Sequence, residues 1–165
     1  MENLPINLKS LKINHGAVRR LFKELCYYEK EEQELKNKLN NTKDEIKPSN
    51  QMVSTDDILQ ETIRVLAHTN TNFQNSLKKL IEIINTKFTN ILEINTKNIT
   101  FCSNYSEEDL KEKCGELYED IFKEVNAINE TLQNIFEHIK DMTLPICNSN
   151  VTNNTITPQE NCIEI

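Results

Sequence analysis

The side chains that could perform chemistry are few and scattered along this chain of 165 residues. The histidines are His15, His68 and His138, and the five cysteines are Cys26, Cys102, Cys114, Cys147 and Cys162. No two cysteines form a CxxC pair, the spacing typical of zinc and thioredoxin-like sites. We therefore predict free, reduced thiols, no metal site and no bound cofactor.

A catalytic constellation is also missing from the local sequence. No Ser-His-Asp or Cys-His arrangement is indicated, and Gly16 and Gly115 are isolated rather than part of a phosphate-binding loop. Carboxylates are abundant, but they fall on helix faces exposed to solvent, where their pKa values have little reason to shift. We predict that the protein is not an enzyme and acts by binding.

Charge and hydropathy exclude several partners. The net charge of −7 argues against nucleic acid and against an anionic membrane surface. No stretch approaches the roughly 18 apolar residues of a transmembrane helix. The first residues, MENLPINLKS, lack the basic start and apolar run of a signal peptide. We expect a cytoplasmic protein.

Three long helical stretches position these residues, at about 8–47, 56–93 and 106–142. In each stretch, apolar residues recur alternately three and four positions apart, a pattern typical of a coiled-coil-like bundle. In the first stretch this seam runs through Leu11, Asn14, Val18, Leu21, Leu25 and Tyr28. Since Asn14 is taken as the seam position, its neighbour His15 lies off the seam, and we expect no convergence of the histidines.

The predicted fold is all-α, an elongated antiparallel three-helix bundle formed by residues 1–142. The short polar link after Pro48 makes the first two helices antiparallel neighbours. Polar seam residues at Asn14, Glu32 and Thr42 are expected to set the register of packing, and the seam positions Asn14, Glu32 and Asn70 are candidates for contacts between chains. The Asn- and Thr-rich segment 143–165 is predicted to be a disordered tail.

Between the second and third helices, residues 94–105 lose the helical period. Their β-branched residues are compatible with a strand, but an isolated strand is unstable, so we favour a loop. A capping signature at Ser106 and Asp109 then opens the third helix.

Charge is uneven between the first and third helices. Residues 8–47 carry ten Lys/Arg and seven Asp/Glu, whereas residues 107–142 carry four and eleven. This asymmetry favours contact between the two helices, but two solvated faces would show the same pattern.

One stretch carries a family resemblance. Residues 12–31, KINHGAVRRLFKELCYYEKE, resemble the first helix of the tubulin-binding cofactor A family, and ILQE at 58–61 resembles a segment of that family's second helix. The resemblance covers roughly residues 8–92. It departs from the family in the longer 94–105 segment, the longer third helix and the additional tail.

The resemblance implies a cytoplasmic, cytoskeleton-associated folding chaperone with β-tubulin as its partner. Such a cofactor captures β-tubulin after release from the chaperonin, ahead of heterodimer assembly, and other tubulin-folding cofactors are further candidate partners. The outward residues of the matching segments are then the expected binding residues: Gly16, Arg20, Lys23, Glu24, Glu29, Lys30, Gln60 and Glu61.

Heptad seams alone would fit a different class of protein equally well. A structural or scaffolding three-helix module, unrelated to tubulin, has the same pattern. The sequence also leaves open whether the protein is a monomer or a homodimer.

Overall fold

The structure, a computed structural model, describes the backbone of residues 3–43 and 49–144 and the side chains of residues 3–41 and 55–144. Its elements in chain order are α1 (Leu4–Lys43), α2 (Ser49–Lys87), β1 (Leu92–Ile94), β2 (Ile99–Phe101), α3 (Glu107–Cys114), the 3-10 turn η1 (Gly115–Leu117) and α4 (Tyr118–His138). The predicted all-α class is confirmed, with a small hairpin as its only described sheet.

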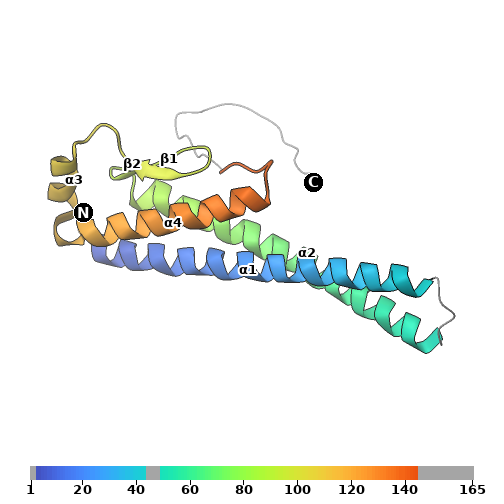
Figure 1. Cartoon of the computed structure of the whole chain (residues 1–165). Helices are drawn as coiled ribbons and strands as arrows, with labels where there is room; N and C mark the ends of the chain where they lie inside the picture. The colour runs from blue at the N-terminus through green and yellow to red at the C-terminus, as the bar shows by residue number, and fades with distance from the viewer. Residues whose placement is uncertain (1–2, 44–48, 145–165) are drawn as a thin grey trace, which may run out of the picture.

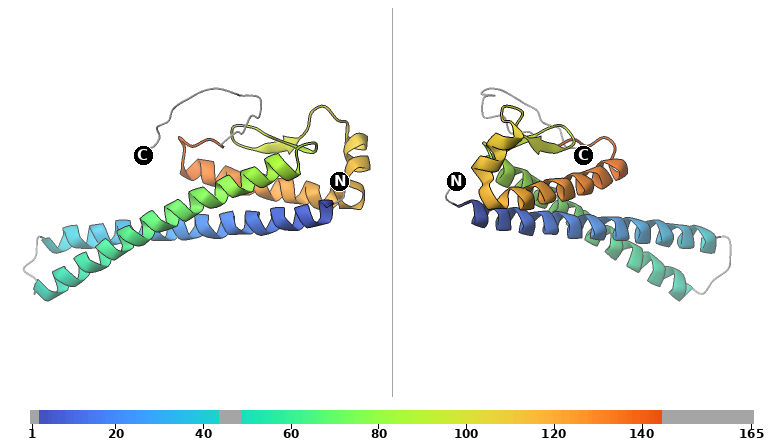
Figure 2. Two further views of the ribbon diagram at one scale, coloured as in Figure 1. Left: turned by 180° about the vertical axis from the view of Figure 1, so that it is seen from behind. Right: turned by 60° about the vertical axis from the view of Figure 1, so that its left-hand side comes forward.

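The two longest helices form an antiparallel hairpin, and α4 packs along part of it (Figures 1 and 2). Contacts occur in the same order along α1 and α4: His15 meets Glu124 and Thr131, and Glu29 meets His138. The two helices therefore run parallel. Beyond the end of α4, the last part of α1 and the first part of α2 extend without a third helix beside them (Figure 1).

The core lies where α4 and the β-hairpin pack against the two long helices. On α1 the fully buried positions are spaced by three and four residues from Leu4 through Leu8, Leu11, His15 and Val18, and resume at Leu25. The core also contains residues of α2 and α4, among them Phe73, Leu77, Leu80 and Ile84 of α2 and Ile121, Ile128, Leu132 and Ile135 of α4. Amphipathic periodicity thus places one stripe of each helix in a common core.

The prediction of a loop at 94–105 was wrong. Leu92 to Ile94 pair antiparallel with Ile99 to Phe101, so the strand partner comes from the residues just before the segment. The side-chain amide of Asn129 on α4 stabilises β2. It accepts a hydrogen bond from the backbone N–H of Ile99 and donates one to the carbonyl of Ile99, each at 2.8 Å.

The third helix is interrupted, where we predicted a continuous helix over 106–142. Gly115 adopts φ +60°, a conformation that residues with a Cβ rarely take, and it ends α3 and begins the turn η1 that leads into α4. The capping prediction is confirmed, because Ser106 and Asp109 form a reciprocal capping box at the start of α3. At the other end, α4 stops at His138 rather than at 142.

The predicted bounds of the first two helices also differ from the structure. α1 begins at Leu4, with Pro5 in its first turn, where a missing N–H costs no hydrogen bond. α2 begins at Ser49, seven residues before the predicted start, and ends at Lys87 rather than 93. The predicted proline stop at Pro48 lies outside the described residues.

The predicted seam was shifted by one residue at two places. His15 is buried, with 3% of its surface exposed, whereas Asn14 is half-buried and donates to the carbonyl of Ser10. On α2, Thr69 is buried and Asn70 is exposed. Glu32 is half-buried, and its carboxylate lies 3.2 Å from the amine of Lys36 on the same helix.

The predicted tail, 143–165, lies outside the described residues except at its first two positions. Of these, Leu144 is buried, and its N–H donates to the carbonyl of Thr96 in the hairpin turn. Leu144 is therefore part of the folded domain rather than of a disordered tail. Across the described helices, no segment has the length and apolar character needed to cross a membrane.

Candidate partner-binding face

The side of α1 opposite the core carries a second stripe with the same spacing. We call it the outer face of α1, and its residues are Ile6, Lys9, Ile13, Gly16, Arg20, Lys23 and Tyr27. Because consecutive members are three or four residues apart on one helix, their side chains project from one face.

The outer face carries most of the large apolar side chains that are exposed in the described part of the chain. Among the described side chains, five large apolar residues are exposed, and Ile6, Ile13 and Tyr27 are three of them. Ile13 and Tyr27 are 62% and 61% exposed. Tyr27 also packs edge-on against Tyr28, with ring centroids 5.2 Å apart, which restricts its orientation. Clustered exposed apolar residues mark interaction surfaces more often than scattered ones do.

The same face is positively charged, although the whole protein is acidic. Residues 4–23 contain five Lys/Arg and no Asp/Glu. Arg20 lies 3.9 Å from the carboxylate of Glu24, but both side chains are largely exposed, so this pair neutralises the arginine only weakly. The N-terminal half of α1 therefore presents a basic surface to an approaching partner.

Gly16 lies in the middle of this face, and nothing inside the protein requires a glycine there. A Cβ built at Gly16 would meet no atom within 4 Å. A glycine in a helix interior costs about 1 kcal/mol relative to alanine. The packing within the described structure thus gives no reason for a glycine at this position.

The other predicted binding residues do not all join this face. Glu24 and Lys30 are exposed at its margin. Glu29 instead points toward α4, where its carboxylate meets the imidazole of His138. The resemblance to the family signalled the α1 stretch but could not separate its two sides.

Gln60 and Glu61 lie on α2, away from Gly16. Both are exposed, and Glu61 pairs with Arg64 on its own helix. Glu61 also borders a shallow groove of about 300 Å³ between the long helices, which Tyr28 and Ile58 line as well. Tyr28 is twelve residues after Gly16, or about 18 Å along the helix at 1.5 Å per residue.

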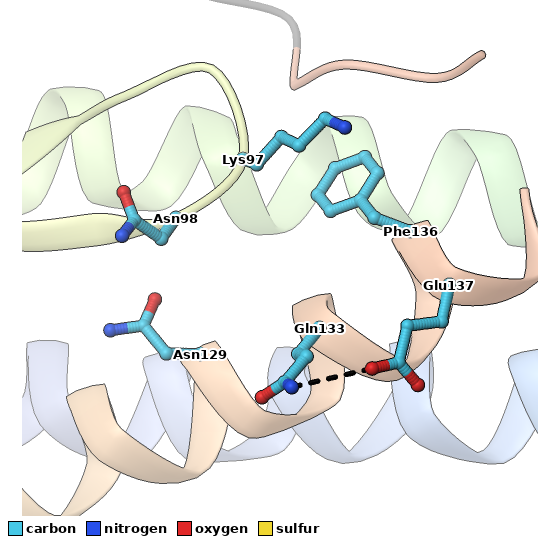
Figure 3. A pocket seen from close by; sticks show the side chains of 6 residues that line it. All are labelled: Lys97, Asn98, Asn129, Gln133, Phe136 and Glu137. Atoms are coloured by element: carbon cyan, nitrogen blue, oxygen red, sulfur yellow. Dashed lines mark hydrogen bonds between the residues drawn. The ribbon is translucent and has the colours of Figure 1, made fainter. Parts of the chain in front are cut away.

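A further cleft, of about 410 Å³, lies between the turn of the hairpin and α4 (Figure 3). The amine of Lys97 lies 5.9 Å from the centre of the Phe136 ring, and Gln133 donates to Glu137. Lys97 thus lies over an aromatic ring, and Gln133 and Glu137 bond each other on one face of α4. The cleft offers no cluster of groups suited to catalysis.

Sequence reasoning missed two features of these surfaces. The predicted binding residues do not include Ile6, Ile13 and Tyr27. Ile13 is seven residues after Ile6 and Tyr27 is fourteen after Ile13, so this spacing already places all three on one helix face outside the seam. The buried His15 was placed on the wrong side, and its partners Glu124 and Thr131 are more than a hundred residues away in sequence.

Comparison of the sequence with models of known protein families gives a match. The model of the tubulin binding cofactor A family matches residues 7–105, more than half of the chain. The chain belongs to the tubulin binding cofactor A family. No significant match was found among curated proteins or among solved structures.

Membership in the tubulin binding cofactor A family supports a general role in tubulin binding and folding. The match contains α1 from Asn7 onward, all of α2 and the β-hairpin. It therefore includes the outer face of α1 except Ile6, whereas α3 and α4 follow the matched region.

Proposed function

We propose that this protein is a non-enzymatic tubulin-folding cofactor that captures β-tubulin after its release from the chaperonin, in the cytoplasm and ahead of heterodimer assembly. The family match over residues 7–105 is the observation that carries this proposal. The fold is compatible with capture, because an elongated helical rod offers long faces and needs no nucleotide for such a role.

The outer face of α1 is the proposed tubulin-binding surface. Ile13 and Tyr27 supply apolar contact area, and aromatic anchors of this kind dominate binding energy at many interfaces. Arg20 and Lys23 orient and accelerate the encounter, since exposed charges contribute more to association rate than to affinity. The complementary surface on tubulin is accordingly acidic with apolar patches.

The remaining predicted residues receive separate roles. Glu24 and Lys30 form the margin of the interface, and Gln60 and Glu61 form a second contact area on α2. We assign Glu29 to the contact with α4 rather than to the tubulin interface, because His138 occupies its carboxylate.

Charge reversal tests the proposed surface. The double variant Lys23→Glu, Lys30→Glu replaces two attractions with repulsions of about 0.7 kcal/mol each. Together these weaken β-tubulin binding roughly tenfold. The measurement is retention of β-tubulin, released from denatured heterodimer, on the immobilised protein. Lys79→Glu, an exposed lysine on α2, is the matched control and should bind normally.

The outcomes separate the function from the surface. If the unmodified protein does not retain β-tubulin, the capture function is wrong and a scaffolding role takes its place. If it retains β-tubulin and the double variant does so equally well, the function stands and the assignment to the outer face of α1 is wrong.

Gly16→Ala gives a second test in which stability and binding move in opposite directions. Because a Cβ at Gly16 meets open space, alanine should stabilise the helix by about 0.5–1 kcal/mol. If the tubulin surface approaches the helix closely at Gly16, the same substitution weakens capture. Improved stability with unchanged capture would show that no partner approaches this position closely.

A further inference from the structure

Three side chains with different ligand atoms meet where α4 ends against the middle of α1. The thiol of Cys26, a carboxylate oxygen of Glu29 and a ring nitrogen of His138 all lie within 4.8 Å of one another. Cys26 and Glu29 are three residues apart on α1, so they share a face, and His138 is the last residue of α4. This cluster is separate from the outer face of α1.

We propose that Cys26, Glu29 and His138 form a Zn²⁺-binding site that fastens the end of α4 to α1. Thiolate, imidazole and carboxylate are the three protein ligands that zinc prefers. Ca²⁺ and Mg²⁺ take oxygen ligands almost exclusively, so the thiol and imidazole disfavour them. A water completes the tetrahedral site, as it does in zinc sites with three protein ligands.

The present geometry is close to what zinc requires. Bonds of about 2.0–2.3 Å in a tetrahedron place the ligand atoms about 3.4–3.7 Å apart. Nε2 of His138 and Oε1 of Glu29 are now 2.5 Å apart in a hydrogen bond, and no pair in the cluster exceeds 4.8 Å. Moves of about 1 Å therefore convert the cluster into a coordination shell.

The surroundings favour a cation at this position. The ring of Phe22 packs edge-on against the imidazole of His138, with centroids 5.6 Å apart, which limits rotation of the ligand. Phe22 also contacts Phe73 of α2 in the core. The last carbonyls of α4 carry the partial negative charge of a helix C-terminus, which attracts cations.

Binding is coupled to proton release. Burial, followed by the nearby Glu29 carboxylate, raises the pKa of the Cys26 thiol, so the metal-free side chain is protonated near neutral pH. On binding, the Sγ–H bond breaks, the proton passes to solvent and the thiolate electron pair forms the bond to zinc. The imidazole binds through a neutral nitrogen, and no oxidation or reduction occurs.

Co²⁺ titration of the reduced, chelator-treated full chain tests the site, because thiolate ligation gives cobalt a charge-transfer band. We expect one Co²⁺ per chain, displaced by Zn²⁺. Cys26→Ser should abolish the band, and His138→Gln should weaken binding at least about tenfold, since even outer-shell partners contribute that much. Zn²⁺ should also raise the melting temperature of the unmodified chain but not that of Cys26→Ser.

Two matched controls distinguish this site from others. His68→Gln removes an exposed histidine on α2, and the double variant Cys147→Ser, Cys162→Ser removes two cysteines outside the described residues. Both controls should bind Co²⁺ normally. Absence of Co²⁺ binding, a band that persists in Cys26→Ser, or a band lost in the double-serine control would each overturn the proposal. Far-UV circular dichroism confirms that every variant is folded.

Discussion

Thr131→Val is the sharpest test of how α4 is fixed on α1. In the structure, His15 lies between two partners: Nδ1 is 2.7 Å from the Glu124 carboxylate, and Nε2 is 2.8 Å from the Thr131 hydroxyl. His15 and Thr131 are 3% and 5% exposed, so water cannot easily replace a lost partner. Valine keeps the shape of threonine but removes the hydroxyl.

The expected loss follows from leaving one buried nitrogen unsatisfied. Such a group costs about 1–3 kcal/mol, more than the net contribution of the hydrogen bond itself. For a domain of this size, each kcal/mol lowers the melting temperature by about 2–4 °C. We therefore expect Thr131→Val to melt about 2–12 °C below the unmodified protein.

Urea unfolding followed by far-UV circular dichroism measures this loss, with an unchanged m value as the condition for comparison. Thr86→Val is the matched control, since the Thr86 hydroxyl is exposed and bonds only the carbonyl of Glu82. It should change stability by no more than about 0.5 kcal/mol.

A double-mutant cycle completes the test. Adding His15→Leu to Thr131→Val removes the unsatisfied nitrogen, so the double variant should be less destabilised than the sum of the single variants, by at least about 0.5 kcal/mol. Additive losses, or a Thr131→Val variant as stable as Thr86→Val, would refute the role we assign to the buried imidazole.

Three further predictions concern other parts of the fold. Asn129→Ala removes both hydrogen bonds to the backbone of Ile99 and should cost about 1–3 kcal/mol while accelerating amide exchange in β2, which hydrogen exchange measures. Gly115→Ala forces a Cβ into φ +60° and should destabilise the protein by about 1–3 kcal/mol in urea unfolding, whereas an alanine that fits would be neutral or stabilising. Burial raises the pKa of the Cys114 thiol, so the folded state holds this proton more tightly than the unfolded state. Its contribution to stability is therefore present below the ordinary thiol pKa and lost as pH rises above it. Alkylation of Cys114, followed by mass spectrometry, should accordingly be slow at neutral pH and accelerate only in alkaline solution. Rapid labelling at neutral pH in the folded chain would contradict this.

The helical architecture was predictable because the signals that specify it are local. Apolar residues such as Leu11, Val18 and Leu25 recur at helical spacing, and burial confirms their side. The capping box of Ser106 and Asp109 is equally local, since both its hydrogen bonds lie within four residues.

The sequence predictions fail in two situations. In the first, a partner distant in sequence determines which residue is buried; in the second, the conformation of a few residues interrupts a longer pattern. A heptad pattern permits a step of either three or four, so Leu11 could be followed by Asn14 or by His15. Polarity does not separate these two residues, and only Glu124 and Thr131 on α4 make His15 the buried one. A seam prediction cannot include partners whose position depends on the tertiary fold.

The hairpin and the break at Gly115 illustrate the second kind of error. The prediction finds no partner for a strand at 99–101, because it places residues 92 and 93 at the end of the second helix and residue 94 in the loop. The apolar period continues through Gly115, so periodicity predicts a continuous helix although the backbone turns there. In both places a conformational preference of a few residues overrides the longer pattern.

The position of the outer face of α1 along the rod has a consequence for its function. None of the described side chains at 26–41 is fully buried, whereas fully buried residues recur from Leu4 to Leu25. Local stability follows buried contact, so the half of α1 beside α4 should be the more rigid half. The outer face, from Ile6 to Tyr27, lies on the back of this rigid half. A surface held in one conformation loses little entropy on binding. Packing of α4, which follows the region that matches the family, thus supports a face that lies almost entirely within that region.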